Sequence, residues 1–559
     1  MPDTPEQMAV GVDGRVDHHG EELPQLTRRS ANLDLERLLR MHHPDFTGVH
    51  PASPSIYALF RVILSIGVRQ QFRSYQVTGL ERVRTDLGAM FVGWHTNGLI
   101  DAAVVVEPSP KRFVFAGRHD MLTGSVIGWW GRRLGVQPLL RQAERLRGGV
   151  DEETAAAINS ASMLTVAAKL AHGHAAALFP EGHSHNESHL IRLRTGPMRS
   201  VLNATVLADR LKLSLPVIHP VGLHFRHCER FRTDTWVEYG DALEVPLLDD
   251  PRHAARLLDG DWDEPDADAT RALRDEVGSR LAPLTPDAPD DATWRAWLLL
   301  GHLRARAEGK RLDSWREEVL AARAIRDGLR SSEESGPWAG PMAEERAERD
   351  LASTSPVAQK GKLLHGLLDE HGLDGRDLHP SAQRSPVQTI LCVFSLLLSI
   401  TLLPFALLAN GPQWAIGWWL SSRTPDPPDK WQTYVFIPGL LGQVFIWPLA
   451  FVLFTTTTNF TLGLVFLAFA AMMLLAGHVG SYSLVQNLVA PAMRGRVISI
   501  STAISVGGPA LGALLMGWLA ELIGLRPALA VMSALALMVV LSVLPTLSRR
   551  TREMEAEPP

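Results

Sequence analysis

The sequence predicts an α/β domain followed by an all-α transmembrane region. From Val77 to about Val245, short apolar segments alternate with helical patterns, which favours a sandwich-like α/β domain. Most of the charge lies before residue 386, and apolar runs long enough to span a bilayer fill the C-terminal part of the chain. Strands are expected at 89–94, 112–116, 174–179, 215–223 and 235–239, with a helix at 152–172.

The composition is an average over two unlike halves of the chain, and it excludes few classes of function. The chain has 559 residues, of which 46% are hydrophobic and 21% charged, and this length predicts two or three domains. A net charge of −5 gives no indication of nucleic-acid binding. Cys228 and Cys392 lie in such different settings that no disulfide is expected, which fits a reducing compartment. The N-terminus shows no secretory signal pattern.

The first 70 residues lead into the α/β domain, which we expect to cover residues 51–245. Residues 1–50 are polar and aperiodic and are expected to form a disordered or loosely packed lead-in. The apolar segment Ser55–Val68 is too short to span a bilayer. A helix lying on a membrane surface and a plain core helix explain this segment about equally well.

A histidine and an aspartate stand on either side of one predicted turn. His95 follows the apolar strand at 89–94, and Asn97-Gly98 supply turn residues before the apolar segment Leu99–Val106. Asp101 should therefore lie close enough to orient the imidazole, and such a pair forms a general base for a hydroxyl nucleophile. From the spacing alone, a histidine that only satisfies the strand end is favoured. A second motif makes a catalytic role for His95 the favoured interpretation.

The second motif is Phe179-Pro180-Glu181-Gly182-His183-Ser184, which comes after another apolar strand. Pro180 fixes the backbone, Gly182 allows it to approach a ligand, and Ser184 can donate to an anion. Glu181 is expected to bind substrate hydroxyls or to hold a neighbouring arginine in place. No metal is expected, because no carboxylate or cysteine at ligand spacing accompanies the histidines at 183, 185 and 189.

Together these motifs resemble the signatures of the glycerolipid (phospholipid and glycerol) acyltransferases, a His-x4-Asp or His-x5-Asp block followed by Phe-Pro-Glu-Gly-x-Ser. The longer spacing from His95 to Asp101 is most similar to the branch that acts on glycerol 3-phosphate. Weaker blocks at 113–118 and 215–223 fit the family order, so the resemblance covers residues 89–225 most specifically. It implies a mixed sheet with flanking helices, with His95 as the catalytic base and Asp101 holding its tautomer.

Several basic and small residues are candidates for binding a phosphate. Guanidinium groups suit bidentate contact with oxyanions, although a solvated basic face explains any one arginine at least as well. The resemblance favours Arg141, and it also matches a basic-Thr-Gly segment, Arg192 to Gly196, before a helix whose first N–H groups favour anions. Arg132 and Arg133 are weaker candidates. The expected substrate-binding residues are Arg118, Arg141, Glu181, Gly182, Ser184, Thr195 and Gly196.

Residues 246–385 form a predicted helical extension and linker. Trp294–Leu303 and Trp315–Leu329 have amphipathic patterns and are expected to pack on the catalytic domain. Ser331–Ala343 is rich in Ser, Glu, Gly and Pro, which is typical of a linker.

The remaining residues are predicted to lie in a membrane. Residues 386–455 are expected to form a membrane hairpin, in which Val387–Ala409 spans and Trp431–Phe454, interrupted by prolines, spans or re-enters. Residues 456–559 resemble the last three helices of a major facilitator superfamily transporter, with generic membrane helices as the alternative. The positive-inside rule makes the proline-containing segment re-entrant, unless the helices lack a single topology. The last three candidate spans are 462–488, 498–523 and 527–547.

These observations predict a membrane-bound O-acyltransferase of phospholipid synthesis. The resemblance implies an acyl-CoA or acyl carrier protein donor, a glycerol 3-phosphate or lysophosphatidate (1-acylglycerol 3-phosphate) acceptor, contact with membrane lipids, and no cofactor. The expected location is the plasma membrane of a bacterium, with several spans and the catalytic domain facing the cytoplasm. A transport-linked protein that handles lysolipid and a catalytically silent scaffold are the alternatives. The transporter-like tail from Thr456 is expected to be dispensable for chemistry.

Overall fold

The computed structural model describes most of the first 378 residues and little of the rest of the chain. The described residues are Leu38, 46–330 with gaps at 120–121, 123–125, 141–151 and 229, 355–378, and short stretches within 386–419 and 515–531. The chain divides into two compact units, one of residues 1–384 with 423–433 and the other of residues 385–422 with 434–559. Only the first unit carries the predicted catalytic motifs.

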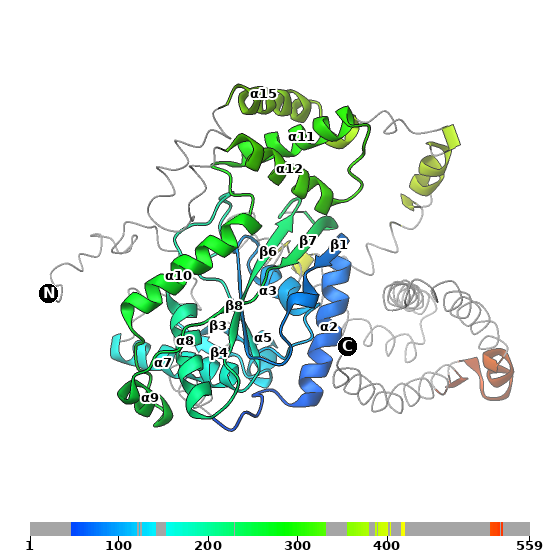
Figure 1. Cartoon of the computed structure of the whole chain (residues 1–559). Coiled ribbons are helices and arrows are strands. Elements are labelled where there is room, and N and C mark those ends of the chain that lie inside the picture. The colour runs from blue at the N-terminus through cyan, green and yellow to red at the C-terminus, as the bar shows by residue number, and fades with distance from the viewer. Residues whose placement is uncertain are drawn as a thin grey trace. The chain divides into compact units, whose positions relative to one another are not determined.

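The first unit is built around a mixed sheet in which the strands lie in the order β1-β7-β6-β2-β5, of which Figure 1 labels β1, β7 and β6. β2 pairs in parallel with both β5 and β6, β6 pairs antiparallel with β7 and with the short β8, and β1 pairs in parallel with β7. All five residues of β2 are buried, as a central parallel strand requires. The strand bounds are β1 Phe72–Thr78, β2 Ala89–Gly93, β5 Ala175–Leu178, β6 Val217–Phe225, β7 Thr233–Tyr239 and β8 Leu243–Glu244.

The strand predicted at 112–116 is largely wrong. Phe113 forms only an isolated bridge with Ala175, in which the Val114 N–H donates to the Ala175 carbonyl at 2.7 Å. The chain then leaves the main sheet, and β3 (Ala116–Arg118) pairs in parallel with β4 (Gln137–Leu139). An apolar run alone could not show that its second half pairs with a segment about twenty residues downstream.

Helices cover both faces of the sheet, which confirms the predicted α/β arrangement with flanking helices. α7 (Glu152–Ala171) and α8 (Gly196–Arg210) bury apolar side chains against Met90 and Val92 of β2. On the opposite face, the Tyr239 hydroxyl of β7 donates to the Val105 carbonyl of α3 (Leu99–Val106) at 2.6 Å. Each fully buried side chain of the size of valine or leucine contributes about 1.5–3 kcal/mol to folding.

The segment at 55–68 forms part of α2 (Pro54–Gln71), whose two sides differ. Tyr57, Leu64 and Val68 are buried against the domain, as expected of a core helix. Leu59, Val62 and Ile66 are exposed. One turn before α2, the His50 ring Nε2 lies 2.8 Å from the Phe113 carbonyl, so the packed domain begins before residue 51.

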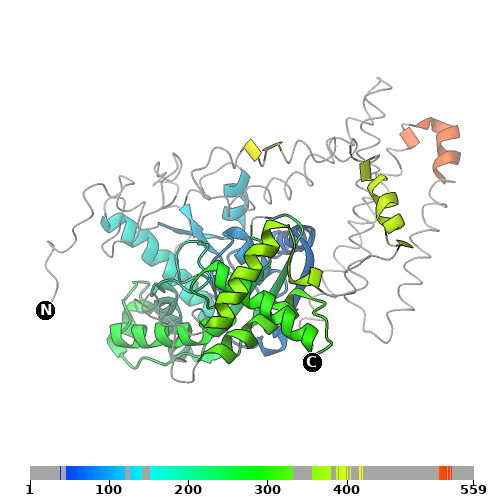
Figure 2. The same cartoon turned by 90° about the horizontal axis from the view of Figure 1, so that it is seen from above.

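The helical extension packs on the end of the sheet formed by β6, β7 and β1 (Figure 1). Trp294 and Trp297 of α11 (Asp291–Ala307) and Trp315 of α12 (Trp315–Leu329) form an apolar cluster with Trp236 of β7. The predicted bounds of the helix at 315–329 are those observed. α15 (Pro356–Glu370) lies against α11, and Figure 2 shows this group from above. The remaining described helices of eight or more residues in this unit are α5 (Val126–Arg133), α9 (Pro251–Leu258) and α10 (Ala267–Leu281).

A buried ion network joins α12 to the sheet. The Arg323 guanidinium donates to Glu238 Oε2 at 2.8 Å and to His224 Nε2 at 3.0 Å. Burial, followed by the charge of Arg323, lowers the pKa of His224 to about 4. Burial disfavours the ionised form of Glu238, but the contacts with His224 and Arg323 outweigh it and lower the pKa of this carboxyl to about 2.

Unfolding should become easier as the pH falls from about 6.5 to about 4. In this window, His224 binds a proton in the unfolded chain but not in the folded protein, so acid stabilises the unfolded state. A pKa lowered from 6.5 to about 4 corresponds to a loss of up to about 3 kcal/mol. Denaturant titrations at pH 7.5 and 4.5 measure it. His224→Gln should reduce the difference in free energy of unfolding between the two pH values by a similar amount, whereas exposed His371→Gln should leave it unchanged. Equal pH dependence in both variants would contradict the role given to His224.

The predicted membrane segments fall mostly outside the described residues. This applies to four of the five candidate spans and to the linker at 331–343, whereas more than half of Val387–Ala409 is described and is helical. Among the residues that the structure describes, no helix combines the length and apolar character that crossing a bilayer requires.

Candidate active site

The turn after β2 places His95 and Asp101 together, and Gly98 makes this turn possible. Gly98 has φ 56° and ψ −125°, a conformation that strains any residue with a Cβ. It directly precedes Leu99, where α3 begins, and the Ile100 N–H donates to the Asn97 carbonyl at 3.1 Å. The chain therefore reverses within a few residues and brings the first turn of α3 back under His95.

Asp101 is fully buried and holds the turn through one carboxylate oxygen. Its Oδ2 accepts from His95 Nδ1 at 2.8 Å and from the backbone N–H groups of Thr96 at 2.8 Å and Asn97 at 2.7 Å. Hydrogen bonds to an ionised carboxylate are stronger than those between neutral groups. They place the imidazole proton on Nδ1 and leave Nε2 of the neutral ring to accept a proton from a substrate.

The imidazole is also held against an aromatic ring of the second motif. Phe179 comes directly after β5, and its ring stacks on His95 with centroids 4.4 Å apart and planes 15° apart. Gly93, the last residue of β2, leaves room for this ring, because a Cβ there would lie 3.0 Å from Phe179 Cε1. Since β2 and β5 are parallel neighbours, both motifs meet at the carboxyl edge of the sheet, where open α/β sheets bind ligands.

Glu181 binds the protein itself rather than standing open to a substrate. Its side chain is buried, and Oε2 accepts from the His95 backbone N–H at 2.7 Å. Oε1 accepts from the Ile191 N–H at 3.0 Å and bonds His185 Nε2 at 2.8 Å. The expected contacts with substrate hydroxyls or with an arginine are replaced by these three donors, because the parallel pairing of β2 and β5 presents the backbone of one motif to the carboxylate of the other.

The small residues of the second motif make room for an arginine. Gly182 has φ +79°, and a Cβ there would lie 2.8 Å from both Cδ and Nε of Arg194. The Arg194 N–H donates to the Pro180 carbonyl at 2.7 Å, which fixes the two segments together. The half-buried Ser184 lies two residues after Gly182.

The predicted helix after the basic-Thr-Gly segment is α8. Thr195 is its N-cap residue but its side chain makes no capping bond, and Gly196 is the first helical residue.

The predicted basic residues lie in different parts of the structure and have different partners. Half-buried Arg118 ends β3, one of the two strands of the small second sheet. Arg132 donates to the Leu122 carbonyl, and Arg133 lies over the Trp129 ring at 5.2 Å from its centroid. Arg141, the favoured phosphate ligand, lies outside the described residues.

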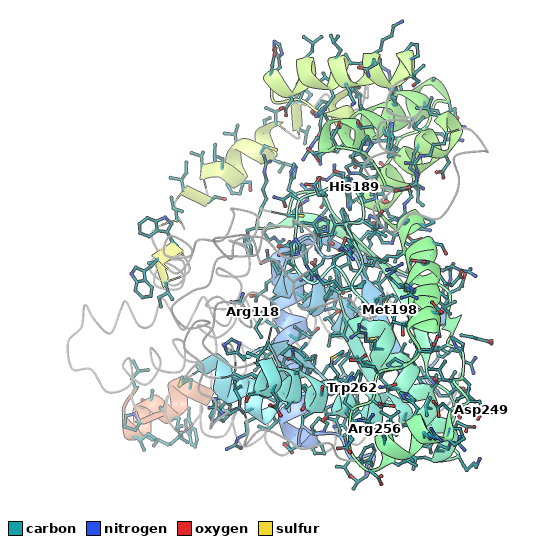
Figure 3. The ribbon with its side chains drawn as sticks, turned by 90° about the vertical axis from the view of Figure 1, so that its left-hand side faces the viewer. Arg118, His189, Met198, Asp249, Arg256 and Trp262 are labelled. Carbon is teal, nitrogen blue, oxygen red and sulfur yellow. The ribbon has the colours of Figure 1, made fainter. Side chains whose placement is uncertain are left out.

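Of the three histidines near the second motif, His183 and His185 contact each other edge to face, with ring centroids 6.3 Å apart. His185 bonds Glu181, whereas His189 Nδ1 lies 3.1 Å from the Ala288 carbonyl, far from Arg118 in Figure 3. Within the described part of the chain, no group of three or more His, Cys, Asp or Glu side chains has a metal-binding arrangement.

Sequence reasoning missed two supporting contacts. His185 orients Glu181, and its backbone N–H donates to the His95 carbonyl at 3.1 Å. Its spacing of four residues from Glu181 was the available signal. Asn97 Nδ2 donates to the Cys228 carbonyl after β6 at 3.2 Å, and no local pattern connects these two residues.

Comparisons with known proteins match the part of the chain that carries both motifs. Residues 74–223 match the family model described as Acyltransferase. The chain is similar to glycerol-3-phosphate O-acyltransferase 1 of Saccharomyces cerevisiae, with 26% identity over 126 residues, and to glycerol-3-phosphate O-acyltransferase 2 of the same yeast, with 27% identity over 113 residues. These segments are 22% and 20% of this chain but only 15% and 14% of the two relatives, so the chain matches a small part of their length.

Among solved structures, the chain is similar to the 1-acyl-sn-glycerophosphate (LPA) acyltransferase of Thermotoga maritima. The two share 13% sequence identity with a TM-score of 0.26, and the match covers 43% of this chain and 86% of that one. The family match ends at residue 223 and gives no support to the transporter resemblance of residues 456–559. Residues 74–223, which carry both predicted motifs, therefore resemble an acyltransferase domain.

Proposed function

We propose that the protein transfers an acyl group from an acyl thioester to a hydroxyl of glycerol 3-phosphate or 1-acylglycerol 3-phosphate. The observation that carries this proposal is the His95–Asp101 pair, in which a buried carboxylate binds Nδ1 of the imidazole and leaves Nε2 for the substrate. The similarity to two proteins named glycerol-3-phosphate O-acyltransferase supports the choice of acceptor. Acyl-CoA and acyl carrier protein both supply the required thioester.

The geometry supports direct transfer without an acyl-enzyme. The acceptor hydroxyl oxygen attacks the thioester carbonyl carbon while its proton moves to His95 Nε2, and Asp101 stabilises the imidazolium that results. The tetrahedral intermediate then collapses, the carbon–sulfur bond breaks, and the departing thiolate takes the proton from His95. The products are an ester and a free thiol, and the base returns to its starting state.

We expect the acceptor phosphate to be bound by the basic and small residues that the sequence predicts for it. Arg118, at the end of β3, would supply a guanidinium, and Ser184 would supply a hydroxyl. Gly196 begins α8, whose first N–H groups favour an anion. Arg141 is the remaining proposed phosphate ligand, and it is included on the sequence resemblance alone. The location that we propose is a bacterial plasma membrane, with the catalytic domain on the cytoplasmic side.

An acyl-transfer assay on the purified full-length protein tests this function. Each acceptor is combined with acyl-CoA and with acylated carrier protein, and both the free thiol and the acylated product are quantified. We expect one ester formed for each thiol released, with little release when the acceptor is omitted. Thiol release that does not depend on either acceptor, or no release from either donor, would overturn the proposal.

A further inference from the structure

A polar cavity opens where the helical extension meets the sheet. It has a volume of about 350 Å³ and lies among the start of β1, the turn between β6 and β7, the α11–α12 connection and the short helix η4 (Gly375–Leu378). That volume suits a small molecule rather than a macromolecule. None of the residues proposed above for the acceptor lines this cavity.

The cavity has an excess of positive charge. Among the described residues that line it, six are cationic and three are carboxylates, and two further carboxylates, Asp374 and Glu308, pair with cations at the rim. Positive charge still exceeds negative charge, and five of the six cations are arginines, whose planar groups suit phosphate oxygens. The six cations are Arg73, Arg226, Arg306, Lys310, Arg311 and Arg376.

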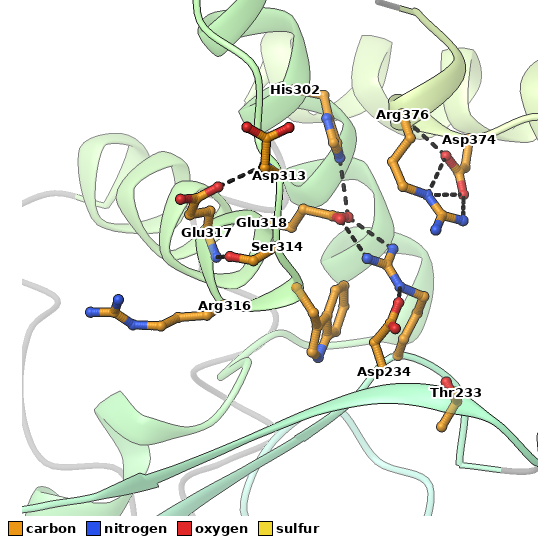
Figure 4. Close-up of polar contacts among 12 residues, drawn as sticks. Thr233, Asp234, His302, Asp313, Ser314, Arg316, Glu317, Glu318, Asp374 and Arg376 are labelled. Carbon is orange, nitrogen blue, oxygen red and sulfur yellow. Dashed lines mark hydrogen bonds and ion pairs between the residues drawn. The ribbon is translucent and has the colours of Figure 1, made fainter. Parts of the chain in front are cut away.

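The inner wall is fixed by a bonded network around Arg226. Its guanidinium donates to Asp234 Oδ2 at 3.0 Å and to Glu318 Oε2 at 2.8 Å, and it lies over the Trp315 ring at 4.3 Å from the centroid. His302 Nε2 lies 3.1 Å from Glu318 Oε2 (Figure 4). Burial opposes ionisation of Asp234, but Arg73 and Arg226 outweigh it, so the pKa of this carboxyl lies below its usual value. The wall is therefore organised before any ligand binds.

The rim is accessible and carries the cations that can turn toward an occupant. The side chains of Lys310 and Arg376 are 71% and 41% exposed, and each is paired with a carboxylate that is itself about 40% exposed. Exposed pairs of this kind contribute little to stability, so an anion can compete for the cation at small cost.

The cavity is connected to the catalytic turn through the end of β6. Arg226 directly follows β6, two residues before Cys228, whose carbonyl accepts from Asn97 Nδ2. The Asn97 N–H in turn donates to Asp101 Oδ2. The segment that carries Arg226 is thus joined to the Asp101 carboxylate through a single residue.

We propose that this cavity binds a phosphate-bearing small molecule at a site separate from that of the acceptor phosphate. The phosphate could belong to the nucleotide part of the acyl donor or to a free phosphorylated effector, and the chemistry of recognition is the same in both cases. The site rests on the charge and arrangement of the cavity and does not require the proposed acyl transfer.

Calorimetry on the full-length protein with inorganic pyrophosphate tests the site. The double variant Lys310→Gln/Arg376→Gln removes two rim cations whose partners are exposed, so folding should be unaffected. Loss of two charge-assisted contacts should weaken pyrophosphate binding at least about tenfold. The matched control is Arg271→Gln/Arg280→Gln, which removes two exposed, paired cations from α10 and should bind as the unmodified protein does. Equal binding by both double variants, or no binding by the unmodified protein, would overturn the proposal.

The source of the phosphate is identified with adenosine 3′,5′-bisphosphate and with donor kinetics. If the rim variant weakens binding of this nucleotide and raises the donor KM, the site holds the acyl donor. If it weakens pyrophosphate binding but leaves the donor KM unchanged, the site holds a free effector. Because binding is measured without turnover, a protein that fails to transfer acyl groups but binds pyrophosphate through the rim would contradict the proposed function only.

Discussion

Replacing His95 with alanine should lower kcat for acyl transfer by about 10²–10⁴-fold, the range for loss of a positioned general base. The fold should persist, because the ring is partly exposed and stacks on one face of Phe179. Initial rates at saturating donor and acceptor, together with a denaturant titration, measure both quantities. His371→Ala is the matched control, since this exposed imidazole bonds the Leu367 carbonyl at the end of α15 and should leave kcat unchanged.

Asp101→Asn should be nearly as damaging to kcat. A neutral amide oxygen accepts more weakly than a carboxylate, and rotation of the amide would present N–H groups to three donors. The variation of kcat with pH that reports protonation of the general base should also be lost, because the imidazole is no longer held in the right orientation. Near-normal kcat in a folded His95→Ala protein would exclude His95 as the base, whatever the behaviour of Asp101→Asn.

Replacing Glu181 should reduce kcat by about 10²-fold with little change in the acceptor KM. In Glu181→Ala, the backbone N–H groups of His95 and Ile191 and the ring of His185 lose their acceptor, so the free energy of unfolding should fall by about 3–5 kcal/mol. Glu181→Gln keeps the shape and one oxygen, and it should fold better while remaining slow. Steady-state kinetics with varied acceptor separate kcat from KM.

The values of kcat and the acceptor KM decide whether Glu181 positions the base or binds the acceptor. A substrate-binding carboxylate would raise the acceptor KM when replaced by glutamine, whereas a positioning residue lowers kcat. Glu187→Gln is the matched control, because this exposed glutamate lies in the same loop and its backbone N–H, rather than its carboxylate, bonds His185. A large rise in the acceptor KM for Glu181→Gln with unchanged kcat would contradict the positioning role.

The parts of the site that could be predicted from the sequence are those that form locally. His95 and Asp101 are six residues apart across one turn, so the residue types and the glycine were sufficient to place them together. The contact between Glu181 and the His95 backbone joins residues 86 apart and depends on which strands pair. No local pattern contains that information, and the sequence therefore pointed to substrate hydroxyls or a neighbouring arginine as the partner of this carboxylate.

The same reasoning explains the errors in the sheet. β2 and β6 are apolar runs, and their predicted bounds lie within two residues of those observed. β1, Phe72–Thr78, alternates polar and apolar residues at the edge of the sheet and was missed. The run at 112–116 has the apolar character of a strand, although its residues beyond Val114 leave the main sheet.

The strand order also has a consequence for how the protein is made. β2 acquires its first neighbour only when β5 has been synthesised, and the Arg73–Asp234 pair between β1 and β7 joins residues 161 apart. Such long-range pairing slows folding because a large loop must close before the contact stabilises it. During synthesis, the segment that carries His95 must therefore wait for strands that emerge long after it, first β5 and then β6 and β7. Until then its apolar strand has no partner, and unpaired apolar strands are prone to aggregation.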